Sequence, residues 1–262
     1  MSVSEKLTYL EKARSEYTDN PEEVLKVAAS LVRKGSFSLG ESYWTVCEDL
    51  FYASLSCNTP QWTNFAISEL RKKFGRSHRV LRLEGVLHEY SGKFSQAQEI
   101  YDSLLASSPL DSETWKRKAA LFRTAGNIQK SIAELNAYLE VFQGDLEAWE
   151  ELCDIYLSMQ HYLQACYCYE EIVLSNPHNP QVLLKYAEML YSTGVTEKLN
   201  LARKYFTQVL VLNPKNVRAM WGLYQASTKT NNEKSGPLRE KAKVMLVEAY
   251  KESPININLL EI

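Results

Sequence analysis

Apolar residues recur along this chain in helical stripes that repeat about every 34 positions. Within a stripe they lie three or four residues apart, which is the spacing of one face of an α-helix. Two stripes separated by a short polar segment form one unit. The unit is complete between Leu146 and Pro177, at Trp149, Leu152, Cys153, Tyr156, Ala165, Tyr169, Ile172 and Pro177. This pattern predicts two antiparallel helices joined by a tight turn.

The same pattern returns at a constant interval before this unit and, with insertions, after it. Two successive shifts of 34 residues towards the N-terminus reach Trp115, Ala119, Phe122, Leu135 and Tyr138, and then Leu81, Gly85, Ala97, Tyr101, Leu104 and Pro109. Trp, Leu, a small residue and Tyr, followed by Ala, an aromatic residue and Pro, is the tetratricopeptide (TPR) pattern. We therefore predict an all-α fold, a right-handed α-solenoid of TPR helix-turn-helix repeats, rather than a helical bundle with accidental periodicity.

The repeated positions have a packing role. Small residues are expected where the two helices of a repeat meet, because a large side chain would push the helix axes beyond roughly 8–10 Å; they are Gly85, Ala119, Cys153 and Ala187 on first helices and Ala97, Ala165 and Ala202 on second helices. The aromatic residues Tyr101, Tyr169 and Phe206 are expected to fill the space towards the next repeat. Prolines should end the second helices, because proline disfavours helix before it; they are Pro109, Pro177, Pro214 and Pro254.

The N-terminal segment departs from the repeat but is also helical in pattern. We predict helices over residues 5–17, 22–34, 42–56 and 61–74, with a loop between Gly35 and Gly40; the last two helices form a degenerate TPR-like unit. The predicted organisation is an N-terminal helical cap over residues 1–76 and tandem TPR repeats over residues 77–262. The repeats should occupy about 78–111, 112–145, 146–179, 180–216 and 217–256.

Composition narrows the function classes. The net charge of −2 and a pI of about 6.2 argue against nucleic acid as a partner. No apolar run reaches the 18 or more residues of a membrane span, and no apolar core follows a basic start, so we expect no membrane span and no signal peptide. The five cysteines are odd in number and lie mostly in helical pattern, so reduced thiols packed in the core are favoured over zinc ligands.

Common catalytic and cofactor motifs are missing from the sequence. It contains no phosphate-binding G-x-x-x-x-G-K-[ST], no dinucleotide-binding G-x-G-x-x-G and no nucleophile elbow G-x-S-x-G. The four histidines are widely spread and none lies in H-E-x-x-H. We therefore predict a non-enzyme with no catalytic residues, no metal site and no cofactor.

Stacked TPR units bind other chains along the surface formed by their first helices. By template position this predicted groove has a basic part, an acidic part and two aromatic residues: Arg79, Arg82, Lys116, Arg117 and Arg123; Glu147, Glu150, Glu151 and Asp154; Tyr191 and Trp221. A groove that changes sign favours an extended peptide with matching charge order. Trp221 is the candidate anchor, since tryptophan often carries interface energy. The alternative is that these charges form solvated helix faces with i,i+4 pairs.

Several stretches go beyond a generic TPR sequence, over residues 70–80, 133–140, 144–149, 176–179, 202–206 and 218–224. They resemble the subunit 2 family of the endoplasmic reticulum (ER) membrane protein complex. The resemblance implies a peripheral scaffold subunit on the cytoplasmic side of the ER membrane, within a hetero-oligomer that inserts tail-anchored and multipass proteins. Its implied partners are cytosolic segments of membrane-embedded subunits and a soluble subunit with an MPN-type fold. The alternative is a soluble TPR adaptor that binds an extended peptide of an unrelated protein.

Overall fold

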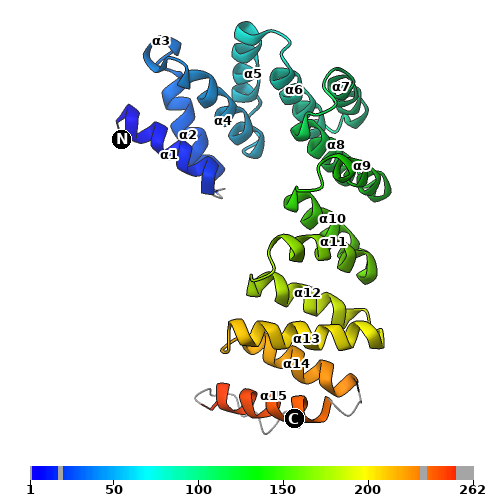
Figure 1. Cartoon of the computed structure of the whole chain (residues 1–262). Coiled ribbons are helices and arrows are strands. Elements are labelled where there is room, and N and C mark those ends of the chain that lie inside the picture. Colours follow the sequence, from blue (N-terminus) through cyan, green and yellow to red (C-terminus); the bar gives the residue numbers. More distant parts are fainter. Residues whose placement is uncertain (1, 17–19, 231–234, 252–262) are drawn as a thin grey trace. The chain divides into compact units, whose positions relative to one another are not determined.

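A computed structural model describes residues 2–16, 20–230 and 235–251. Over these residues the chain forms fifteen α-helices and no β-strand, which confirms the predicted all-α fold (Figure 1). The helices belong to two compact units, Met1–Glu134 and Leu135–Ile262. The predicted division into a cap of residues 1–76 and repeats over residues 77–262 stays a prediction.

The first unit begins with five helices that share one hydrophobic core. Leu31, Leu50, Phe51 and Leu70 are among its buried residues. The loop predicted between Gly35 and Gly40 contains one helical turn instead, because it buries Leu39 against this core. The helices of the unit are α1 (Val3–Glu16), α2 (Pro21–Val32), α3 (Ser36–Leu39), α4 (Ser42–Ser56), α5 (Pro60–Phe74), α6 (His78–Tyr90), α7 (Phe94–Ser107), α8 (Ser112–Thr124) and the start of α9 (Ile128–Val141).

The second unit is a stack of helix pairs (Figure 1). Its helices are the end of α9, α10 (Leu146–Ser158), α11 (Tyr162–Ser175), α12 (Pro180–Ser192), α13 (Thr196–Leu212), α14 (Val217–Lys229) and α15 (Ser235–Ala249). The prolines at 109, 177 and 214 follow the ends of α7, α11 and α13, as predicted. Pro254, predicted to end the last helix, lies outside the described residues.

Polar residues begin the first helix of each repeat at the same register. Each of them accepts a hydrogen bond from a backbone N–H of the first turn, which satisfies a donor that the helix itself leaves free. Four of these N-caps are spaced by 34 residues and the last by 37; they are Ser77, Asp111, Asp145, Asn179 and Asn216. The period of the apolar stripes is thus repeated by an independent set of polar residues.

The turns inside the repeats also share one backbone conformation. Gly92, Gly126 and Gly194 have positive φ values of 70°, 76° and 69°, and Gln160 takes the equivalent position with a φ of 60°. Positive φ is cheap for glycine but strained for residues with a Cβ atom. One repeat therefore turns at a residue that is poorly suited to the turn.

Small residues on first helices make room for aromatic rings from second helices. A Cβ atom on Gly85 would overlap the ring of Tyr101, and one on Gly222 would overlap the ring of Phe206. Phe206 therefore packs towards the next repeat, as predicted. Tyr101 lies against Gly85 of its own repeat and shares a core cluster with Leu121 of α8, so it also packs towards the next repeat, as predicted.

Candidate partner-binding site

Three of the arginines predicted to line a basic groove are paired with acidic residues of other helices in the first unit. Arg79 on α6 pairs with Glu48 on α4. Arg117 on α8 lies 3.5 Å from a carboxylate oxygen of Glu89 on α6. These ion pairs cross between helices, so they are not the i,i+4 pairs within one helix that were considered as the alternative.

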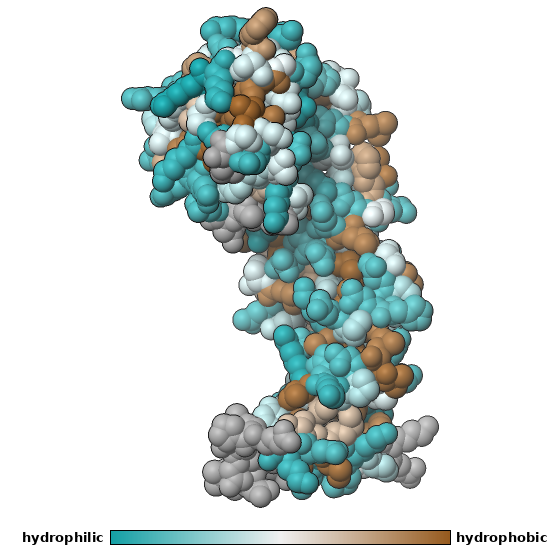
Figure 2. All heavy atoms as spheres, turned by 90° about the vertical axis from the view of Figure 1, so that its left-hand side faces the viewer, coloured by the Kyte–Doolittle hydropathy of each residue, from teal (hydrophilic) through white to brown (hydrophobic). Residues whose placement is uncertain are grey.

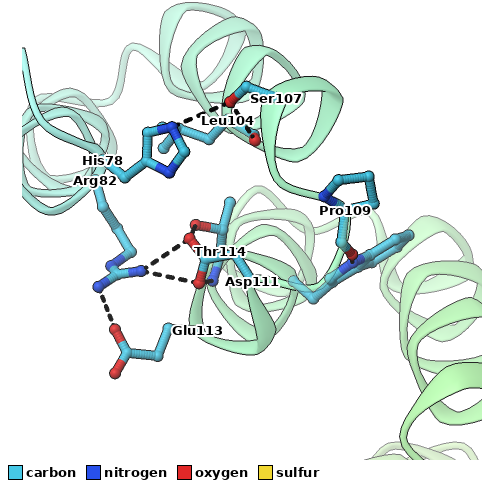
Figure 3. Close-up of polar contacts among 9 residues, drawn as sticks. His78, Arg82, Leu104, Ser107, Pro109, Asp111, Glu113 and Thr114 are labelled. Carbon is cyan, nitrogen blue, oxygen red and sulfur yellow. Dashed lines mark hydrogen bonds and ion pairs between the residues drawn. The ribbon is translucent and has the colours of Figure 1, made fainter.

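Arg82 is the most enclosed of these arginines, with 18% of its side chain exposed. Its guanidinium donates to both carboxylate oxygens of Asp111, at 3.0 and 3.1 Å, and also pairs with Glu113 (Figure 3). Asp111 is itself the N-cap of α8 and accepts from the backbone and hydroxyl of Thr114. One carboxylate therefore begins α8 and ties it to α6.

A second interaction in Figure 3 lies beside this one: His78 of α6 and Ser107 of α7 lie 3.2 Å apart, ring nitrogen to hydroxyl. Of the remaining predicted basic residues, Lys116 is half-buried and Arg123 is exposed on α8. The basic part of the predicted groove is thus largely held by contacts within the chain, and its arginines brace neighbouring helices.

The predicted acidic residues lie on α10 in the second unit. Glu147, Glu150 and Asp154 are exposed and Glu151 is half-buried. Glu150 and Asp154 are one helical turn apart and form no ion pair with any residue that the structure describes. They stand at the rim of a cavity of about 320 Å³. Its lining comes from α10, α11, α12 and α14: Glu150, Asp154, Leu157, Tyr169, Lys185, Glu188, Met189, Ser192 and Arg218.

Tyr169 lies at the base of this cavity, and only 3% of the residue is exposed. Burial, together with the carboxylates of Glu150 and Asp154, raises the pKa of its hydroxyl. The hydroxyl has no hydrogen-bond partner over the described ranges. Arg218 and Glu188 pair with each other at one side of the cavity. Sequence periodicity placed Glu150 and Asp154 on this surface but did not find Tyr169 as part of it, because it treated Tyr169 as a residue that fills the space towards the next repeat.

The two predicted aromatic residues are already engaged within the second unit. The ring of Tyr191 lies 4.2 Å from the ammonium of Lys229. Trp221 is half-buried, and its indole N–H donates to the hydroxyl of Tyr250 at 3.3 Å. The exposed anchor envisaged for Trp221 is therefore a residue that packs partly against the end of the unit.

The cysteines behave as core residues. Cys47, Cys153, Cys166 and Cys168 are buried, and Cys57 is half-buried; all are free thiols. Burial raises the pKa of Cys153 to about 12 and that of Cys166 to about 11, which leaves both thiols protonated and unreactive near neutral pH. Within residues 2–16, 20–230 and 235–251, no group of His, Cys, Asp and Glu is arranged to hold a metal ion.

The second unit also has an apolar surface, formed by α9, α10 and α11. Leu163 and Tyr167 are more than half exposed, and Trp149 packs edge-on against Tyr167 with 6.2 Å between ring centres. With Leu152 and Tyr156 these residues line a second cavity. On the face drawn in Figure 2, apolar residues form separate patches between hydrophilic side chains, so no single apolar area dominates it. None of the helices that the structure describes is long and apolar enough to cross a membrane.

Comparison with known proteins gives a consistent result. A family model described as the EMC2 TPR-like repeat domain matches residues 76–200. ER membrane protein complex subunit 2-A of Xenopus laevis is 40% identical over 214 residues, covering 82% of this chain and 72% of the relative. ER membrane protein complex subunit 2 of Dictyostelium discoideum is 38% identical over 174 residues, covering 66% of this chain and 54% of the relative.

Among solved structures, one similar chain is the C-terminal part of a TPR repeat-containing protein from Cytophaga hutchinsonii. Its TM-score is 0.60 at 14% sequence identity, covering 97% of this chain and 98% of that chain. At this identity the similarity shows the TPR fold and nothing about function.

Proposed function

Because the chain belongs to the ER membrane protein complex subunit 2 family, we propose that it is a non-catalytic scaffold subunit of that complex. The observation that carries the proposal is the 40% identity to a named subunit over 82% of the chain. A scaffold role also agrees with the fold, since stacked helix pairs present large surfaces to other chains. We place the subunit at the cytoplasmic side of the ER membrane, as a peripheral part of a hetero-oligomer.

In this proposal the subunit supports insertion of tail-anchored and multipass proteins by holding other subunits in place. The surface of the second unit around Glu150, Asp154 and Tyr169 captures an extended cytosolic segment of a membrane-embedded subunit. The apolar surface around Leu163 and Tyr167 suits a folded neighbour, for which we propose the soluble MPN-fold subunit. Ion pairs such as Arg82 with Asp111 keep the helices in position before binding, which lowers the ordering cost of association.

Cell fractionation tests the proposal. A tagged copy of the chain should sediment with microsomes, should be released by high salt or alkaline carbonate, and should recover other subunits of the complex upon purification. It should also leave the microsomes when those subunits are depleted. A chain that remains in the supernatant of a gentle extract, and that purifies with an unrelated protein, would support the adaptor alternative instead.

A further inference from the structure

One arrangement of side chains occurs in both units, but its carboxylate is present only in the first. In the first unit, the hydroxyl of Tyr101 donates to Glu89, and Glu89 pairs with Arg117. The equivalent positions two repeats later are occupied by Tyr169, Leu157 and Lys185. The carboxylate that joins the tyrosine to the cation in the first unit is therefore replaced by an apolar side chain in the second.

This replacement leaves the hydroxyl of Tyr169 without a partner among the described residues. Tyr169 is 97% shielded from solvent, yet its hydroxyl bonds to no described residue and faces the cavity between α10 and α12. Because this hydroxyl opens into the cavity and is unpaired, it is available to accept a hydrogen bond from a group that enters from outside.

The charges around that hydroxyl indicate which group it is. Glu150 and Asp154 stand at the rim without ion-pair partners among the described residues, although like charges one turn apart on a helix repel each other. The corresponding positions in the first unit are Arg82 and Val86, so this acidic pair belongs to the second unit alone. Of the two cations that line the cavity, Lys185 can offset the charge of these two carboxylates, because Arg218 is already paired with Glu188. Two carboxylates and one ammonium remain outside that ion pair, so the cavity has a net negative charge.

We infer that this cavity receives a lysine or arginine side chain from an extended segment of a partner protein. The ammonium or guanidinium would donate to Glu150, Asp154 and the hydroxyl oxygen of Tyr169, since such groups carry several donors and no acceptor. The aliphatic stem would lie against Leu157 and Met189, as the stems of long cationic side chains do on apolar surfaces. The inference rests on the proposed function in one respect, that the partner is another subunit of the complex.

The chemistry of the cavity is tested on the purified full-length chain, without any partner. The probes are acetyl-Leu-Lys-amide, acetyl-Leu-Glu-amide and acetyl-Leu-norleucine-amide, and the readout is the ring signal of Tyr169 in a ¹³C-tyrosine-labelled sample, assigned with Tyr169→Phe. Only the lysine probe should move that signal, and it should fail to do so when Glu150→Gln and Asp154→Asn are combined. A response to the glutamate probe, or no response to lysine up to about 10 mM, the range of the weakest specific binding, would overturn the inference.

Use of the cavity in the cell is tested by purifying tagged variants and quantifying the other subunits that accompany them. Glu150→Gln with Asp154→Asn should lower recovery about tenfold, and Tyr169→Phe should lower it severalfold without changing the melting temperature. The matched control, Glu240→Gln with Glu248→Gln on α15, should recover normal amounts, and Lys185→Gln should recover at least as much.

Normal recovery by the first two variants would contradict the inference while leaving the proposed function intact. A wild-type chain that recovers no other subunit would contradict the proposed function and leave the peptide result to stand alone.

Discussion

Gln160 adopts a backbone conformation that the equivalent turns assign to glycine. Its φ of 60° matches those of Gly92, Gly126 and Gly194, but its Cβ atom makes the left-handed conformation costly. The side chain is exposed, so packing offers no visible compensation.

We therefore expect Gln160→Gly to stabilise the protein by about 0.5–1 kcal/mol, the relief of strain being offset in part by the greater freedom of glycine in the unfolded chain. Thermal denaturation should show a melting temperature raised by about 1–3 °C. The reciprocal control, Gly126→Gln, should lower it. A Gln160→Gly variant that melts below the wild type would mean that the turn is not strained.

Asp49 is a second residue in an unfavourable environment, because its burial opposes ionisation of the carboxyl group. It lies on α4, is 8% exposed, and receives Arg14 on one carboxylate oxygen at 3.2 Å, while the other oxygen has no partner among the described residues. Burial raises the pKa of this carboxyl to about 6, against the lowering effect of Arg14.

Because the folded-state pKa is raised, ionised Asp49 destabilises the fold, and its contribution to stability should fall as the pH rises from about 4 to about 6. Asp49→Asn keeps an acceptor for Arg14 and removes the buried charge. At pH 7 we expect the variant to be more stable by roughly 1–3 kcal/mol, and at pH 3.5 to match the wild type. Urea titrations across this pH range measure the difference. A constant difference at all pH values would contradict the assignment to Asp49.

At the scale of the helix pair, small residues decide how closely two helices approach. The hydrogen of Gly85 is all that separates α6 from the ring of Tyr101. We expect Gly85→Ala to cost about 1–3 kcal/mol, because the ring must leave its preferred place. Gly144→Ala, where the added carbon meets open space, is the control and should change the melting temperature little. Equal effects of the two substitutions would show that the contact is not tight.

Helix starts give a second prediction at this scale. Asp111 caps α8 and binds Arg82 of α6, whereas Asn179 caps α12 by its contact with Gln181 alone. Asp111→Ala should therefore cost about 2 kcal/mol and Asn179→Ala about 1 kcal/mol. In the background of Arg82→Ala the difference between them should disappear. Denaturant unfolding of the single and double variants provides this comparison, and a difference that persists without Arg82 would assign it to the cap.

Sequence periodicity predicted most elements but not their polar contacts. The apolar interval of 34 residues was sufficient for helix pairs because it sets which face of each helix is buried. It missed α3, since a single turn is too short to show periodicity. Partners such as Arg82 and Asp111 could not be predicted, because a face position does not specify which side chain a flexible arginine will reach.

At the scale of the whole chain, the net charge of −2 conceals two different distributions. Cations of the first unit are used mainly to hold its helices together, as with Arg79, Arg82 and Arg117. The second unit leaves Glu150 and Asp154 open at a cavity. The sequence suggested one groove with a basic and an acidic half, whereas we propose that a partner is recognised chiefly by the acidic part. Reversing Arg117 would accordingly report on stability more than on binding.

The polar caps at the start of each first helix have an evolutionary consequence. α13 has 17 residues where α11 has 14, yet Asn216 restarts α14 in the usual way. A capping side chain fixes where winding begins, whatever the length of the segment before it. An insertion in one repeat therefore does not change where the next helix begins. The repeats that follow keep their pattern of buried and exposed positions, so individual helices can lengthen during evolution while the rest of the chain stays the same.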